Sequence, residues 1–210
     1  MAAPAESSLP VNRVQALSDG IFAIAMTLMI LDFRVPEFSG SEAPGFLARY
    51  FWALWPKIVC YAMSFLMLGV FWIGHHNQFH FIKKSTRFLI WIDIVFLMLI
   101  AFIPFSTAFL GRYWKERAAI DLYGANVVFC GLALYGHWVY AVRNGLVVVQ
   151  EKVAVRIVGR RILLGMAFYI LAMAISLLPC FRPQWSLFIY AVLPFLYLLP
   201  GKIDRYWIDQ

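Results

Sequence analysis

The sequence predicts an all-α, polytopic membrane protein, and three features of the chain support that fold class. Of its 210 residues, 63% are hydrophobic and only 14% are charged, whereas an ordinary soluble domain has roughly 45–50% and about 25%. The apolar residues gather in long runs, separated by short segments that contain Lys, Arg and Pro. A helix needs about 20 mostly apolar residues to cross a bilayer. Residues 1–210 are therefore expected to form a single transmembrane domain of six helices.

The spans follow from the apolar runs in chain order. The first is expected over residues 13–33, because a proline follows that run. The second is expected over residues 46–81, where a pair of lysines follows. As one helix it would be about 54 Å long and would overshoot a hydrocarbon core of about 30 Å. The remaining spans are expected over residues 86–113, 118–142, 158–180 and 183–200.

The positive charges give the orientation. With both termini in the cytoplasm, 11 Lys and Arg residues fall on the cytoplasmic side and 7 on the outer side, as expected if cytoplasmic loops retain positive charge. The net charge of +7 is therefore interpreted as a topology signal and an attraction to anionic lipid, not as a nucleic-acid-binding surface. The three cysteines are isolated inside apolar stretches, so neither a zinc site nor thiol chemistry is expected: Cys60, Cys130 and Cys180.

Five Asp and His residues lie well inside the predicted spans, where such groups need partners and are functional candidates: Asp19, His75, His76, Asp93 and His137. Counting from the cytoplasmic end of each helix places Asp19, His76, Asp93 and His137 about 9–11 Å inside that end, and His75 is one residue deeper than His76. The leading interpretation of this layer is a hydrogen-bond and ion-pair network that fixes helix register. A proton relay or pH sensor and haem or metal ligation by His75 and His137 remain open.

A narrow stripe runs along the first predicted span at intervals of 3, 4, 4 and 3 residues: Leu17, Gly20, Ile24, Leu28 and Leu31. Thr27 borders the stripe. Asp19 lies five residues before Ile24, or about 140° around the helix, so it points away from the stripe toward neighbouring helices. Packing against another helix of the bundle is the usual role of such a stripe, and pore lining is the alternative.

Two motifs resemble a known family. The segment from Arg13 to Asp19, R-V-Q-A-L-S-D, resembles the R-x-x-x-F-S-D signature on the first helix of the transmembrane protein 175 family, with Leu17 in place of Phe. The segment from Trp72 to His76, W-I-G-H-H, resembles the W-x-x-H-H ending of that family's second helix. The family comprises endosomal and lysosomal potassium channels and their prokaryotic relatives. Its prokaryotic, single-repeat members are similar to the whole chain.

The resemblance implies a potassium-selective cation channel with passive ion flow. It implies a homotetramer in the plasma membrane, with membrane lipid and K⁺ as partners and with no cofactor, metal or catalytic residue. The T-V-G-Y-G filter is absent from this sequence, and in the family the first helices line a central pore. By position, the resemblance implies the main constriction at Ile24, further apolar rings at Leu28 and Leu31, and an effect of Thr27 on ion preference. It also implies a structural network on the cytoplasmic side: Arg13, Ser18, Asp19, His75 and His76.

Two other functions remain open beside the channel. A proton- or cation-coupled secondary transporter typically has inverted repeats and broken helices, whereas Pro104 and Pro194 are the only mid-span prolines and no repeat accompanies them. A haem-binding or enzymatic membrane protein would use the His/Asp layer. If the chain is a channel, Asp19→Ala is expected to impair folding or assembly more than permeation.

Overall fold

A computed structural model describes residues 10–37, 44–147, 152–178, 182 and 184–198 of the chain. Within these residues the regular structure is helical, which confirms the all-α prediction, and an isolated bridge joins Ile82 to Val147. The helices are α1 (Val11–Leu28), the 3-10 turn η1 (Met29–Asp32), α2 (Phe46–Ala53), α3 (Trp55–Phe81), α4 (Arg87–Arg112), α5 (Arg117–Arg143), α6 (Lys152–Leu177) and α7 (Gln184–Leu198).

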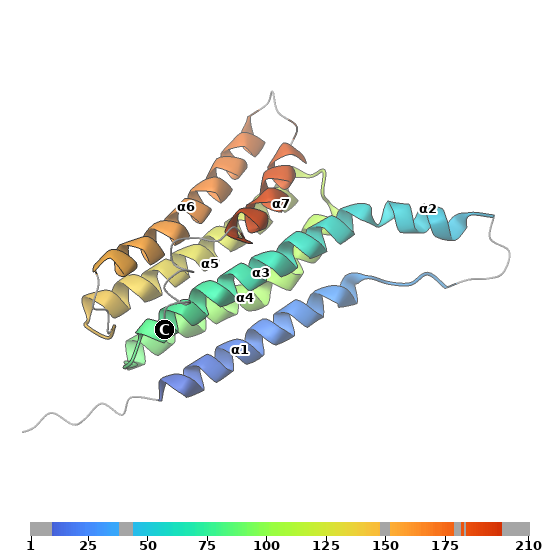
Figure 1. Ribbon diagram of the computed structural model, residues 1–210. Coiled ribbons are helices and arrows are strands. Elements are labelled where there is room, and N and C mark those ends of the chain that lie inside the picture. The colour runs from blue at the N-terminus through green and yellow to red at the C-terminus, as the bar shows by residue number, and fades with distance from the viewer. Residues whose placement is uncertain (1–9, 38–43, 148–151, 179–181, 183, 199–210) are drawn as a thin grey trace, which may run out of the picture.

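The long helices lie side by side as a bundle (Figure 1). Helix α4 packs against α1, α3 and α5, while α5 packs against α6, and α7 contacts α3, α5 and α6. The core between them is apolar and includes the fully buried side chains of Leu68, Ile100 and Tyr123. Helix α1 lies at one edge of the bundle, where only one of its faces contacts the rest of the subunit (Figure 1).

The second predicted span differs from the single helix expected over residues 46–81. The structure divides it at Leu54 into the short helix α2 and the long helix α3. Pro56 lies in the first turn of α3 and has no N–H, so it cannot donate to the carbonyl one turn earlier, and the helical ladder is interrupted there. Helix α2 projects beyond the bundle, which leaves a span of 27 residues (Figure 1).

Five helices in the described part of the chain are long and apolar enough to cross a membrane. They comprise Val11–Asp32, Trp55–Phe81, Arg87–Arg112, Arg117–Arg143 and Ile157–Leu177. The sixth predicted span, residues 183–200, corresponds to α7, which has 15 residues against about 20 for a crossing helix. Six spans therefore remain a prediction. Residues 199–200 lie outside the described residues.

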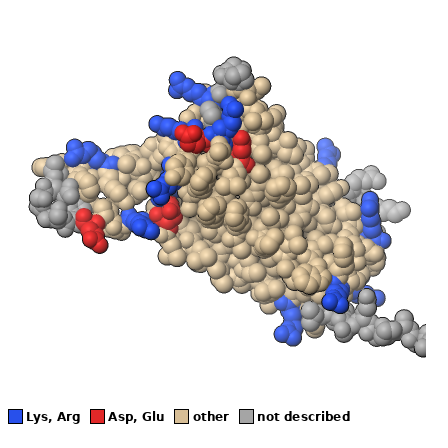
Figure 2. Space-filling model, turned by 180° about the vertical axis from the view of Figure 1, so that it is seen from behind, with Lys and Arg blue, Asp and Glu red and all other residues tan. Residues whose placement is uncertain are grey.

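The charged side chains lie toward the ends of the bundle, with a broad uncharged surface between them (Figure 2). In this view the acidic side chains gather at one end, and the opposite end displays only basic ones (Figure 2). Large apolar side chains are exposed on the helices, among them Trp91, Met98 and Phe188. Such a surface is unfavourable in water and suited to lipid or to another subunit.

An ion pair fixes the far end of the first span to α3. The Nζ atom of Lys57, in the first turn of α3, lies 2.7 Å from an Oδ atom of Asp32 in η1. Gly111 of α4 packs closely against the backbone of Lys57, since a Cβ added to this glycine would lie 3.3 Å from the Cα of Lys57. Lys57 therefore belongs to the bundle and not to a loop.

Asp32→Asn and Lys57→Met are expected to couple by about 0.5–1 kcal/mol in thermal unfolding of the detergent-purified protein, because a partly exposed ion pair is worth little more. The coupling should fall at high salt, since screening weakens exposed pairs. Arg34→Met serves as the control, because Arg34 is exposed and forms no ion pair with a described residue. Additive effects of the Asp32 and Lys57 substitutions at low salt would contradict the prediction.

Candidate functional site: the first helix and its polar network

The two faces of α1 have opposite environments. Its buried face consists of Val14, Ser18, Phe22 and Ala25, and Met29 of η1 continues it. The residues of the predicted stripe are exposed instead, with Ile24 58% and Leu31 69% exposed. The stripe is therefore not part of the subunit's own core. In a membrane, it must face lipid, another subunit or an ion path.

The 3-10 turn keeps the end of this stripe in line. Leu28 ends α1, and Leu31 lies in η1 three residues later. Because a 3-10 helix has three residues per turn, side chains three apart point the same way. Both leucines are exposed, as is the neighbouring Thr27. The apolar face therefore continues past the end of the α-helix.

The hydroxyl of Thr27 is oriented by its own helix. Its Oγ1–H group is shared between two backbone carbonyls, at 3.0 Å from the oxygen of Ala23 and 2.9 Å from that of Ile24. A hydroxyl that donates to the backbone keeps its oxygen lone pairs for another donor or a cation. An acceptor is thus placed beside the apolar stripe.

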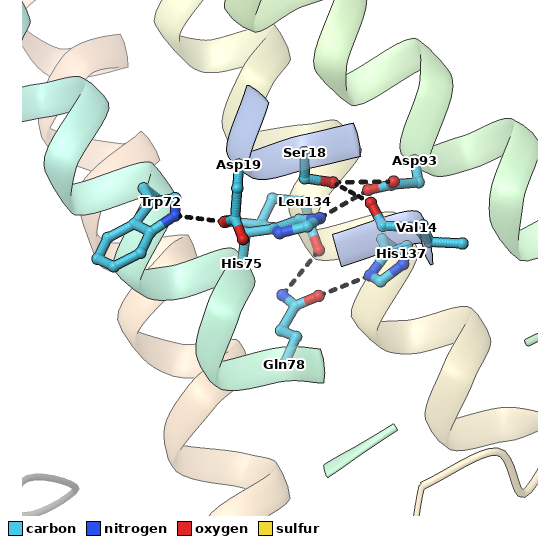
Figure 3. A network of polar contacts seen from close by, with 9 residues as sticks. All are labelled: Val14, Ser18, Asp19, Trp72, His75, Gln78, Asp93, Leu134 and His137. Atoms are coloured by element: carbon cyan, nitrogen blue, oxygen red, sulfur yellow. Dashed lines mark hydrogen bonds and ion pairs between the residues drawn. The ribbon is translucent and has the colours of Figure 1, made fainter. Parts of the chain in front are cut away.

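The buried face of α1 is joined to two other helices through one carboxylate, Asp93 of α4 (Figure 3). The Nε2 atom of His75 on α3 lies 2.7 Å from Asp93 Oδ1. Ser18 donates to the carbonyl of Val14 at 3.0 Å and, more weakly, to Asp93 Oδ2 at 3.4 Å. All three interacting side chains are buried. Because a carboxylate accepts, Nε2 of His75 is the nitrogen that carries the proton.

A second pair extends the network toward α5. Gln78 donates from Nε2 to the carbonyl of Leu134 at 3.1 Å, which leaves its Oε1 as the acceptor for Nδ1 of His137 at 2.7 Å. The rings of His75 and His137 lie 6.0 Å apart (Figure 3). His137 Nε2 is buried without a hydrogen-bond partner among the described residues. The network therefore includes side chains from α1, α3, α4 and α5.

Asp19 lies outside this buried network. Its Oδ1 accepts a 2.8 Å hydrogen bond from the indole N–H of Trp72, and both side chains are exposed (Figure 3). The ring of Trp72 lies 5.5 Å from that of His76. Asp19 thus points toward α3, as the helical angle predicted, but the buried carboxylate is Asp93. Arg13 is exposed and forms no ion pair with a described residue.

The structure therefore divides the predicted network in two. Ser18 and His75 meet at Asp93 inside the subunit, while Asp19 and His76 flank Trp72 on its surface. Sequence reasoning missed Gln78, although its position three residues after His75 places both on one helical face. In the described part of the chain, no three His, Cys, Asp or Glu side chains converge as a metal-binding group. Cys60 and Cys130 are free and buried, and Cys180 lies outside the described residues.

Known proteins share the fold of this chain. Residues 13–104 match the family model described as the endosomal/lysosomal potassium channel TMEM175. A crystal structure of a lysosomal potassium-selective channel TMEM175 homolog from Chamaesiphon minutus superposes with a TM-score of 0.79 at 27% identity, covering 90% of this chain and 96% of that one. The chain belongs to the TMEM175 family. This family is one of ion channels and not of enzymes, and the chain is a membrane protein.

Relatives differ in how much of their length the chain matches. A potassium channel of Streptomyces collinus is 37% identical over 138 residues, which cover 64% of this chain and 66% of that relative. The human endosomal/lysosomal proton channel TMEM175 is 33% identical over 105 residues, 45% of this chain but only 20% of the human protein. The chain therefore resembles bacterial TMEM175 members over most of their length and animal members over a part.

Proposed function

We propose that this chain is the subunit of a potassium-selective cation channel, a homotetramer in which four copies of α1 line a central pore. The exposed apolar face of α1 is the observation that carries the proposal. Its opposite face is fixed to α3 and α4 through the buried hydrogen bonds to Asp93. The bundle thus holds α1 firmly while its apolar stripe is left for an ion path, in a family whose members are channels.

The constriction in this proposal is Ile24. Four Ile24 side chains converging on an axis form an apolar collar, which excludes water when narrow and conducts after a small outward movement of α1. Leu28 and Leu31 form further rings along the same face. Thr27 borders this face and supplies an oxygen acceptor, because its hydroxyl proton is already donated to the backbone. Without a T-V-G-Y-G filter, selectivity depends on the cost of dehydration and on dipoles such as this hydroxyl.

The proposed topology has six crossing helices, α7 included, with both termini in the cytoplasm of a plasma membrane. The basic end of the surface in Figure 2 then faces the cytoplasm, in agreement with the tendency of cytoplasmic segments to be positive. K⁺ passes through the channel as its permeant ion, membrane lipid surrounds it, and no resident cofactor takes part.

The reversal potential of the purified protein in planar bilayers tests the proposal, with K⁺ on one side and Na⁺ on the other. We expect currents that reverse close to the potassium equilibrium potential, because the proposed pore prefers K⁺. Several animal relatives are named proton channels, so a second recording under a pH gradient measures proton permeation through the same pore. Saturable flux that requires a co-substrate would indicate a transporter instead, and folded protein without current would contradict the channel.

A further inference from the structure

A cavity of about 370 Å³ lies among α3, α5, α6 and α7. Its lining residues come from these four helices and include none from α1, so it is separate from the proposed pore. Most of its wall is apolar, with Met67 and Val70 from α3, Val127 from α5, and Ile162 from α6. A volume of this size falls in the range of roughly 300–1,000 Å³ in which proteins bind small molecules.

Glycines shape this cavity. Gly131 of α5 faces Met166 of α6, where an added Cβ would lie 2.5 Å from the Met166 side chain, and a Cβ on Gly165 would overlap the Tyr197 hydroxyl. These two glycines let the helices approach closely around the cavity. At Gly74 of α3 a Cβ would meet Leu134 at 3.5 Å, an ordinary contact. The space is thus bounded by tight helix contacts on the α6 side.

The amide and the guanidinium of the wall, from Asn77 and Arg161, lie toward one end. Asn77 comes four residues before the end of α3, and Arg161 comes nine residues after the start of α6. At 1.5 Å per residue, they lie about 6 Å and about 14 Å inside those two helix ends. In the proposed topology, with both termini in the cytoplasm, the end of α3 and the start of α6 both lie on the cytoplasmic side. The apolar part of the cavity therefore extends inward from a polar mouth.

Arg161 has a fixed position but no anionic partner among the described residues. The hydroxyl of Tyr197 donates to the Arg161 carbonyl oxygen at 2.9 Å, and the guanidinium lies 5.9 Å from the centre of the same ring. An unpaired guanidinium inside a membrane span is costly. Its planar set of N–H donors matches the oxygens of a phosphate.

We propose that this cavity binds an acyl chain of an anionic phospholipid whose phosphate is held by Arg161. The bilayer supplies such chains at high concentration, and the cytoplasmic leaflet is where anionic lipids attract basic segments. The apolar walls take the chain, while the phosphate neutralises the guanidinium at the mouth. The site does not depend on conduction, because it lies away from α1.

Native mass spectrometry of the delipidated full-length protein tests the site by titration with phosphatidylglycerol and with phosphatidylcholine of the same chains. We expect one tightly held phosphatidylglycerol per subunit and weaker retention of phosphatidylcholine. Arg161→Gln should weaken phosphatidylglycerol binding about tenfold, because hydrogen bonds to a charged partner are lost. Val70→Trp should weaken the binding of both lipids by filling the cavity. Arg160→Gln is the matched control and should change affinity less than about twofold, since Arg160 is exposed and does not line the cavity.

Several results would overturn the proposal. If Arg160→Gln and Arg161→Gln lower the affinity for phosphatidylglycerol equally, the lipid is held by general attraction to a basic surface and not by this site. Glycerol phosphate that binds as tightly as the lipid would make it a site for free anions. If lipid binds only to a variant that is shortened to end at Leu198, residues 199–210 and not a lipid occupy the cavity of the full-length protein. Gel filtration and helicity show whether Arg161→Gln folds. If it does not, the test rests on Val70→Trp, and a folded Val70→Trp variant that binds lipid as tightly as the wild type overturns the proposal.

Discussion

Replacing Ile24 with Asn is expected to raise single-channel conductance several-fold and to move the reversal potential between K⁺ and Na⁺ toward zero. Ile24 is 58% exposed on the face of α1 that the subunit's own packing leaves free. In the proposed tetramer, four amides in place of four apolar side chains would hydrate the constriction and remove the barrier that dewetting creates. Planar-bilayer recordings under K⁺/Na⁺ gradients measure both quantities on the same channels.

Ile170→Asn provides the matched control for this experiment. Ile170 is the same residue type, is 54% exposed, and lies on α6 at the other edge of the bundle from α1 (Figure 1). Its substitution should leave conductance and selectivity as in the parent protein. Unchanged currents in Ile24→Asn would place the constriction elsewhere. The same change in both variants would mean that the polar substitution acts through the lipid-facing surface.

The sequence predicted most of the helices because a hydrophobic run of sufficient length has few alternatives in a membrane. It also predicted which side chains share one face of the first helix, but the usual role of such a stripe, packing inside the bundle, is not what the structure of the subunit shows. The spacing from Leu17 to Leu31 sets their angular positions, and the structure places Ile24 and Leu28 on the exposed side. Counting residues from the helix ends predicted that His75 and Asp93 share a depth, and the structure joins them at 2.7 Å.

Counting could not tell which carboxylate of that layer is buried. Depth along a helix follows from the rise per residue, but a contact also depends on how neighbouring helices are rotated and packed. Ser18 and Asp19 are adjacent in sequence and therefore about 100° apart on α1. This angle separates Ser18, which reaches Asp93, from Asp19, which reaches Trp72. The division of the second span at Leu54 was not predicted from the sequence, because Pro56 was treated as part of one continuous apolar run.

Replacing Asp93 with Ala is expected to destabilise the subunit by about 1–3 kcal/mol, the typical loss when a buried hydrogen-bonding group is left without its partner. Asp93 is 1% exposed and accepts from both His75 and Ser18. Its removal leaves a buried imidazole N–H without an acceptor and opens a cavity in the contact of α1 with α4. Folded yield and thermal unfolding in detergent should both fall. Asp19→Ala should lower them much less, because its carboxylate and Trp72 are exposed in the subunit.

A compensating double variant distinguishes the loss of this pair from general damage to the core. The ring of His75 stacks on Phe96, with centroids 5.3 Å apart, and lies 4.7 Å from Phe79, so a phenyl ring suits the same space. His75→Phe combined with Asp93→Leu removes donor and acceptor together, which costs far less than stranding one of them. Recovery of most of the unfolding temperature in the double variant would assign the pair a structural role. If Asp19→Ala proved as damaging as Asp93→Ala, the exposed contact with Trp72 would instead carry the stability of the first helix.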